Sequence, residues 1–273
     1  MAQVAFKCEI VGANLRSFVS VLEVCSSQLS KVTFEAGQET LVLRGMSDEQ
    51  TTAMRVELLP SACRLYECHC ADSPISVNWS GLRHRLPSYS NFNMLAVAIC
   101  VQPRFVHLCC LLDIDACENI YLCERGQPCH QLRCDVSRGL STTAVSSKFC
   151  AMLNSDATSE ERIWFVWKGP VSKTQSYVSL CMWLSSFHSE HSASQSGYAS
   201  NASMTAMTEQ EIYELQGVTQ SYSVRALLWC TTICKLGPAV KVAAPDPGDG
   251  SLVLSVMSTP HLRTECFILP LPK

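Results

Sequence analysis

The residues best suited to chemistry in this sequence are its cysteines, of which there are 17 in 273 residues. Two groups have the composition of metal ligands. They are Cys68-His69-Cys70 and the set Cys123, Cys129, His130 and Cys134. Neither group has the spacing of a zinc finger or zinc ribbon, and no Cys-x-x-Cys pair occurs in the chain. The sequence therefore predicts no metal site, and we expect reduced thiols that pack as small apolar side chains.

Catalytic motifs do not occur in the sequence. It contains no Gly-x-x-x-x-Gly-Lys phosphate loop, no Gly-x-Ser-x-Gly elbow and no His-Glu-x-x-His helix. Asp113 and Asp115 could hold the metal ion of a nuclease, but an i, i+2 pair at a strand end is more typical of a turn. We therefore assign no catalytic residue and no cofactor, and we expect a protein that is not an enzyme.

Composition and charge narrow the class of protein. Hydrophobic residues make up 47% of the chain and charged residues 16%, which argues against a largely disordered chain. The net charge of −3 and the pI of about 6.2 argue against coating nucleic acid by bulk charge, but they allow a local basic face. No apolar run approaches the roughly 20 residues of a membrane span, and Met1–Lys7 does not resemble a signal peptide. We expect a soluble protein of the cytosol or nucleus.

Residues 4–58 predict a strand, a helix and three further strands. The alternating apolar positions of the first strand are Val4, Phe6, Cys8 and Ile10. Asn14 is a suitable N-cap for the helix. The apolar face of that helix is Leu15, Phe18, Val19 and Leu22. The three strands are predicted at Lys31–Ala36, Thr40–Met46 and Ala53–Leu58.

The same order of elements returns near the C-terminus. A strand at Val218–Ser223 precedes a helix at Val224–Lys235, which Gly237-Pro238 ends. Three strands follow, at Ala239–Ala243, Ser251–Val256 and Arg263–Leu269, the first two joined by a Pro-Asp-Gly turn. Two copies of one unit at opposite ends of the chain indicate an internal duplication.

The middle of the chain predicts two less regular copies of this unit. Short helices are predicted at Ser80–Leu86, which Pro87 ends, and at Lys148–Asn154. Strands are predicted around the first helix at Arg64–Cys70, Ile75–Trp79, Met94–Val101, Phe105–Leu112, Asn119–Cys123 and His130–Val136. After the second helix, Ile163–Lys168 and Tyr177–Leu184 are predicted strands.

The predicted elements define an α+β fold of two similar domains, each built from two β-α-β-β-β units. The N-terminal domain spans residues 1–136, a connector spans 137–147, and the C-terminal domain spans 148–273. A Ser-rich segment at about 189–207 is predicted to be a surface loop. We expect two helices per domain on one face of a largely antiparallel sheet.

At this point the chain resembles the PCNA family of DNA sliding clamps. Val77-Asn78 resembles the family's junction before the second helix, and Leu269–Lys273 resembles its C-terminal segment. Within the family, the likeness is greatest to the Rad-nine branch of the heterotrimeric DNA-damage checkpoint clamp. Three segments carry it: Phe6–Asn14, His130–Asp135 and Thr208–Gln216.

The resemblance implies a PCNA-like fold whose helices line the lumen of a ring, and a nuclear function in the DNA damage response. The chain would be a non-catalytic subunit that encircles duplex DNA without reading its sequence. Its partners would be two homologous subunits, an ATP-dependent clamp loader, and repair and checkpoint proteins that dock at the connector. No membrane partner is implied.

Two sets of residues would perform these roles. Cations on or at the end of the four predicted helices would face DNA: Arg16, Arg83, Arg85, Lys148, Arg225 and Lys235. An apolar pocket beneath the connector would take partner peptides: Val136, Leu140, Val145, Pro270 and Leu271. Each cation could equally be an ordinary solvated charge, and the connector could be a plain linker.

Three other classes of protein remain open. The chain could be the replicative clamp itself, a homotrimeric processivity factor for DNA polymerase. It could be a Cys-rich β-protein that binds metal or senses redox state. It could also be an unrelated β-rich adaptor in which the repeated order of elements is a coincidence.

Overall fold

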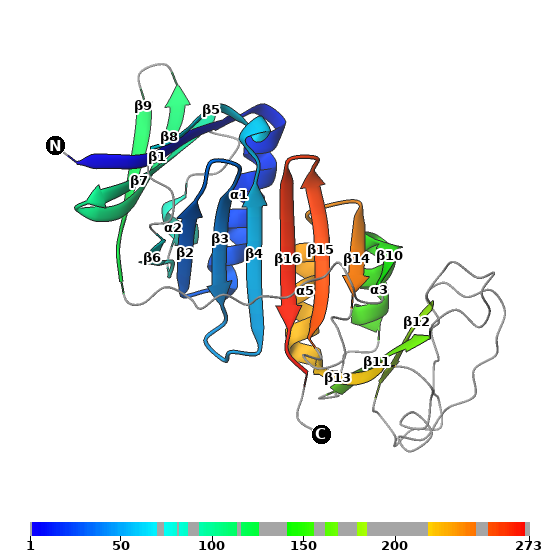
Figure 1. The fold of residues 1–273 in the computed structure, drawn as a ribbon. Coiled ribbons are helices and arrows are strands. Elements are labelled where there is room, and N and C mark those ends of the chain that lie inside the picture. The colour runs from blue at the N-terminus through cyan, green and yellow to red at the C-terminus, as the bar shows by residue number, and fades with distance from the viewer. Residues whose placement is uncertain are drawn as a thin grey trace. The chain divides into compact units, whose positions relative to one another are not determined.

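The structure is a computed structural model, and it describes ten segments of the chain. They are residues 2–69, 74–80, 82–86, 93–113, 116–125, 141–155, 162–168, 179–184, 218–243 and 251–270. These residues form an α+β fold of many strands and few helices (Figure 1), which confirms the predicted class. Contacts divide the chain into two units, residues 1–132 with 257–265 and residues 133–256 with 266–273. No helix in the described segments is long and apolar enough to cross a membrane.

The part of unit 1 that the structure describes contains two antiparallel sheets and two helices. Its elements in chain order are β1 (Gln3–Val11), α1 (Gly12–Gln28), β2 (Lys31–Ala36), β3 (Leu41–Met46), β4 (Thr52–Leu58), a 3-10 turn (Pro60–Ala62), β5 (Cys63–Cys68), β6 (Ile75–Asn78), α2 (Leu82–Arg85), β7 (Met94–Gln102), β8 (Arg104–Asp113) and β9 (Ala116–Cys123). One sheet has the order β5-β1-β7-β8-β9. The other runs β6-β2-β3-β4, and the part of β16 (Leu262–Ile268) that belongs to unit 1 follows β4.

The core of unit 1 lies between its sheets and α1. Phe6, Cys8 and Ile10 of β1 are completely buried, and burying a side chain such as Phe6 stabilises the fold by about 1.5–3 kcal/mol. Helix α1 buries the predicted apolar face, and its Cys25 Sγ lies 3.9 Å from Met54 Sδ of β4. The helix therefore covers the sheet that contains β4.

Two local predictions for unit 1 are wrong. Val4 is 41% exposed because the pairing of β1 with β7 shifts register between Val4 and Phe6, which turns Val4 to the opposite face. Asn14 is not the N-cap, since α1 already begins at Gly12, whose φ of +63° suits glycine. The Asn14 side chain instead donates a hydrogen bond to the carbonyl oxygen of Ala62, 3.1 Å away.

The described residues of unit 2 form a second set of strands and two helices. Its elements are β10 (Ser141–Val145), α3 (Ser146–Ser155), β11 (Arg162–Lys168), β12 (Ser179–Leu184), β13 (Val218–Ser223), α5 (Val224–Cys234), β14 (Ala239–Ala243), most of β15 (Leu252–Thr259) and the end of β16. The strand orders are β10-β14-β15 and β12-β11-β13. The helices contact each other, and the Cys150 thiol of α3 donates to the Thr231 carbonyl oxygen of α5 at 3.6 Å.

The two units repeat one order of elements and one pattern of pairing. In unit 1 the elements β1-α1-β2-β3 precede β6-α2-β7-β8, with β4, the 3-10 turn and β5 between the two groups. Among the described elements of unit 2, β10-α3-β11-β12 precede β13-α5-β14-β15. The pairs β1–β7, β2–β3 and β2–β6 correspond to β10–β14, β11–β12 and β11–β13. The described strands therefore repeat one pattern of pairing in the two units, while the arrangement of two similar domains of β-α-β-β-β units stays a prediction.

The structure also locates the predicted connector in part. Residues 141–145 form strand β10, which pairs with β14, and Ser146 and Ser147 begin α3. Residues 126–140 lie outside the described segments, as do the Ser-rich segment 189–207 and the predicted strand His130–Val136. The domain boundaries at 136 and 147 remain predictions. The second helix is one turn long, shorter than the predicted Ser80–Leu86.

Candidate functional site

The predicted DNA-facing cations lie on two helix pairs, one in each unit. In unit 1, α1 and α2 pack together, and Arg16 and Arg85 are exposed. Arg16 lies beside the buried Leu15, so the helix directs the cation outward by burying its neighbour. Arg83 is also on α2, but its side chain is outside the described part of the structure.

The other cations belong to the helix pair of unit 2. Lys148 on α3 and Arg225 on α5 are exposed, and Lys235 directly follows α5. The Lys235 backbone N–H donates to the Thr231 carbonyl oxygen at 3.3 Å, which fixes this residue at the helix end. The buried Phe149 and Leu227 anchor the two helices. Each helix pair thus presents exposed cations.

The predicted partner pocket is described only in part. Val145 ends β10, pairs with Ala239 and is 43% exposed, so its apolar side chain is accessible. Pro270 follows β16 and is half-buried. Val136, Leu140 and Leu271 lie outside the described segments, so the pocket as a whole stays a prediction.

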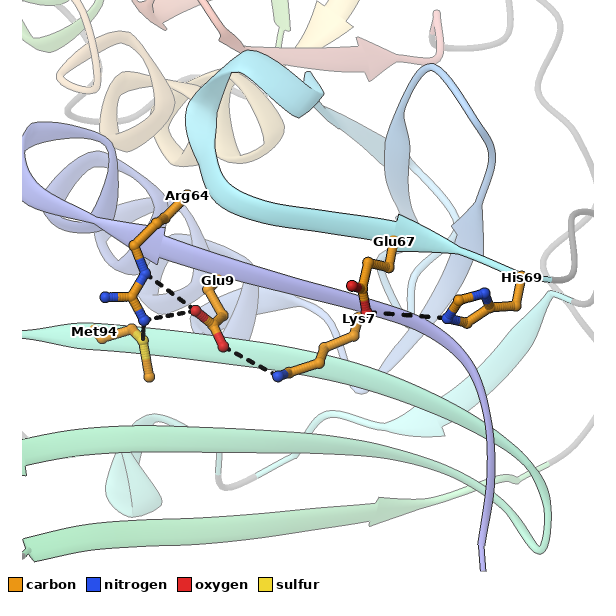
Figure 2. Close-up of polar contacts among 6 residues, drawn as sticks. All are labelled: Lys7, Glu9, Arg64, Glu67, His69 and Met94. Carbon is orange, nitrogen blue, oxygen red and sulfur yellow. Dashed lines mark hydrogen bonds and ion pairs between the residues drawn. The ribbon is translucent and has the colours of Figure 1, made fainter.

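A charged cluster on β1 and β5 was not predicted from the sequence (Figure 2). Arg64 donates to Glu9 Oε2 through Nη2 at 2.7 Å and through Nε at 3.1 Å, while Lys7 Nζ lies 3.1 Å from Glu9 Oε1. The Arg64 hydrogen bond, followed by that from Lys7, holds the pKa of Glu9 below its usual value. The carboxylate is therefore ionised and paired, and the cluster joins β5 to β1.

The same cluster continues along β5. Arg64 Nη2 lies 3.3 Å from the Met94 sulfur of β7, and His69 Nε2 lies 3.9 Å from Glu67 Oε2. Opposite charges alternate here, so the cluster carries no excess charge for an anionic ligand. Alternation in β1 predicts that Lys7 and Glu9 face away from the core, but it does not reveal the partner that β5 supplies.

The described cysteines are free thiols, and most of them are buried. Burial raises the pKa of Cys110 to about 12, and it also raises the pKa of Cys25 and Cys234. Such thiols are poor nucleophiles and act as small apolar side chains. Within the described segments, no group of three or more His, Cys, Asp or Glu side chains is arranged to hold a metal ion.

The metal and nuclease candidates are only partly described. Cys68, His69 and Cys123 are described, whereas Cys70, Cys129, His130 and Cys134 are not. Asp115 lies outside the described segments, and so does the side chain of Asp113.

One described pair has the chemistry of a nucleophile and a base. Ser61 Oγ lies 2.9 Å from His261 Nδ1, and both side chains are solvent-accessible. No described carboxylate or amide side chain hydrogen-bonds the other nitrogen of that imidazole, so the third member of a catalytic triad has no counterpart in this part of the chain. The pair joins the 3-10 turn after β4 to the β15–β16 turn.

Comparison with known protein families gives no matching family model, and comparison with curated proteins gives no significant relative.

Proposed function

We propose that this chain is a non-catalytic subunit of a ring-shaped DNA sliding clamp with a PCNA-like fold, of the heterotrimeric checkpoint type. The observation that carries the proposal is the duplicated order of strands and helices, with the same strand pairing in both units. Such a duplication suits a ring made of repeated units, because equivalent elements recur around the DNA. Fold alone does not imply function, so the site must supply further support.

The helices supply that support. Each unit packs two helices together, and exposed cations project from them on a chain whose net charge is −3. Placing cations on the helices of an otherwise acidic protein suits contact with phosphates from inside a ring and disfavours non-specific adhesion elsewhere. Phosphate contacts position the ring and carry no base information.

The edge of one sheet supports assembly. Strand β9 is last in the order β5-β1-β7-β8-β9, and among the described strands it is paired only with β8. Its residues are mostly exposed, and an exposed strand edge favours pairing with another chain. In this proposal β9 pairs with a homologous subunit, and the ring closes through such contacts.

The assignment to the checkpoint type rests on the sequence resemblance. It implies a nuclear protein that an ATP-dependent loader places on DNA and that recruits repair and checkpoint proteins in the DNA damage response. The alternative within the same fold is the replicative homotrimer, the processivity clamp of DNA polymerase.

Assembly measurements separate these two types. We expect light scattering of the purified chain to give a monomer, and addition of two homologous checkpoint subunits to give a 1:1:1 trimer. A stable homotrimer would contradict the checkpoint type and favour the replicative clamp. A monomer that associates with no homologous subunit would contradict the ring.

A further inference from the structure

The small sheet of unit 2 has two faces of different composition. Strands β12, β11 and β13 pair in that order (Figure 1), and successive residues of a strand belong to opposite faces. One face contains Tyr222 of β13, which is completely buried. By register, β11 contributes apolar residues to the same face, namely Ile163, Phe165 and Trp167. This face therefore belongs to the core of unit 2.

The opposite face combines cations with aromatic residues. On the middle strand β11 it contains Arg162, Trp164, Val166 and Lys168. The two cations occupy the two ends of the strand. On β12, Trp183 is directly opposite Trp164, and directly opposite positions of an antiparallel pair are neighbours on one face. A tryptophan pair therefore occupies this face between two cationic positions.

No acidic residue occupies this face in the described strands. Its other positions are small and uncharged: Ser179, Cys181, Thr219, Ser221 and Ser223. Ser223 is half-buried, whereas Tyr222 beside it on the core face is completely buried. The face is thus cationic and aromatic on a chain whose net charge is −3.

The sheet of unit 1 with the same pairing pattern shows the contrast. There β2 pairs with β3 and β6, as β11 pairs with β12 and β13. On the face opposite the buried Phe34, Glu35 and Arg44 form an ion pair, with Oε2 3.2 Å from Nη2. In unit 1 a carboxylate on the same face neutralises the cation. The described strands of unit 2 place no carboxylate beside Arg162 and Lys168, so the face suits an anionic ligand.

We infer that this face of the sheet β12-β11-β13 binds single-stranded nucleic acid. Cations attract the phosphates of the strand, and aromatic residues stack on its bases. Every base has a π-face, so stacking of this kind does not select a sequence. In a duplex the bases are already stacked on each other, and only the phosphates are offered to the sheet. The face therefore binds a single strand in preference to a duplex.

This inference goes beyond the proposed ring, which encircles duplex DNA through cations on helices. The residues of the sheet lie on no helix, so single-strand binding can be lost while encirclement of duplex remains. Failure of one therefore leaves the other standing.

Fluorescence anisotropy of the full chain with a labelled oligothymidylate tests the inference. The probe has about 12 nucleotides, a length within the range of single-strand sites. We expect binding that weakens as salt is added, and an affinity about tenfold higher than for a duplex of the same length. Equal affinity for the two forms, or no binding of the single strand at low salt, would overturn the inference. Displacement of the probe by an equal concentration of polyglutamate would also overturn it, because charge alone would then be recognised.

Variants of the tryptophan pair test stacking. The double variant Trp164→Ala/Trp183→Ala should lower the affinity for the oligothymidylate by about tenfold or more. Trp164→Phe keeps an aromatic ring and should keep most of the affinity. Trp167→Phe, on the core face of the same strand, is the control and should leave the affinity unchanged. An unchanged affinity in the double variant, with its fold verified by circular dichroism, would contradict the inference.

Variants of the charged positions test the phosphate contacts. Each contact with a single strand contributes about −0.7 to the slope of log affinity against log salt, so Arg162→Ala/Lys168→Ala should flatten the slope by about 1.4 units. Val166→Glu introduces a carboxylate between the two cations and should abolish binding. Val166→Thr, which has a similar shape and no charge, is the matched control. Equal affinities of the two Val166 variants would show that this face does not bind the strand.

Discussion

The Nη1 atom of Arg55 in β4 lies 3.5 Å from the Oε2 atom of Glu265 in β16, and this contact joins residues 210 positions apart within unit 1. The Glu265 side chain is only 3% exposed. Arg263 contacts its other oxygen, and Arg55 also contacts Glu57. The buried Glu265 carboxylate contacts one guanidinium group from β4 and one from β16, so it holds the two strands together. Removal of one guanidinium group would leave a buried charge without compensation, which is strongly destabilising.

This contact predicts a pH dependence of stability. Burial, the main cause, raises the folded-state pKa of Glu265 above its ordinary value of 4.5. The folded chain then binds more protons than the unfolded chain, so the free energy of unfolding falls as pH rises from 4.5 through the folded-state pKa. In Glu265→Gln this contribution is lost. We expect the difference in unfolding free energy, variant minus wild type, to increase with pH across that window.

Urea unfolding at a series of pH values measures this difference. Glu57→Gln is the control, because it removes another carboxylate that contacts the same Arg55 guanidinium. If the difference in unfolding free energy between Glu265→Gln and wild type does not change with pH, burial does not raise the folded-state pKa of Glu265.

Gly45 in β3 provides a test of packing. A methyl group at this position would lie 2.6 Å from Leu29 Cδ1 and 3.0 Å from the Lys31 carbonyl oxygen. Leu29 is 3% exposed and has little room to move, so we expect Gly45→Ala to lower the free energy of unfolding by about 1–3 kcal/mol.

Gly37→Ala is the matched control, since its nearest contact would be the Thr40 carbonyl oxygen at 3.4 Å. Equilibrium denaturation should separate the two variants. Equal stability of the two would show that α1 and its following residues do not pack on β3 as closely as the structure indicates.

Much of the fold follows from the sequence because most strands keep one face in a core. The predicted strand Lys31–Ala36 matches β2 residue for residue, and Ala239–Ala243 matches β14. In these two strands the apolar residues either alternate with polar residues or form a short continuous run, and both patterns are typical of strands. Strand β10 was not predicted, because Ser141-Thr142-Thr143 carries no apolar pattern and becomes a strand by pairing with β14.

The candidate sites were harder to predict because they depend on register. The positions of the helix cations follow from helical spacing. Arg16, Arg85, Lys148 and Arg225 are exposed on their helices, and Lys235 is exposed just beyond α5. The contact of Glu9 with Arg64 depends on which residues of β1 and β5 are opposite each other. A one-residue slip in register would place these side chains on opposite faces.

The helix cations predict the salt dependence of DNA binding. Each phosphate contact contributes about −0.9 to the slope of log affinity against log salt. If Arg83 and Arg85 both contact phosphate, the double variant Arg83→Ala/Arg85→Ala should flatten the slope of the assembled ring by nearly 2 units, equally for every DNA sequence. The measurement is a salt titration of binding.

Lys241→Ala is the control for this titration. Lys241 is exposed on β14 between the buried Val240 and Val242, so it points away from the core of unit 2 and lies on no helix. We expect the slope of log affinity against log salt for Lys241→Ala to equal that of the wild type. An unchanged slope in the double variant would show that α2 does not contact DNA.

The most direct test of the proposed clamp is retention of the assembled ring on closed circular duplex compared with the same duplex made linear. A ring that encircles DNA slides off free ends but cannot leave a closed circle. We expect retention on the circle to persist at salt concentrations that abolish it on the linear form, and cutting the circle should release the ring. Equal loss from circular and linear DNA at every salt concentration would contradict encirclement.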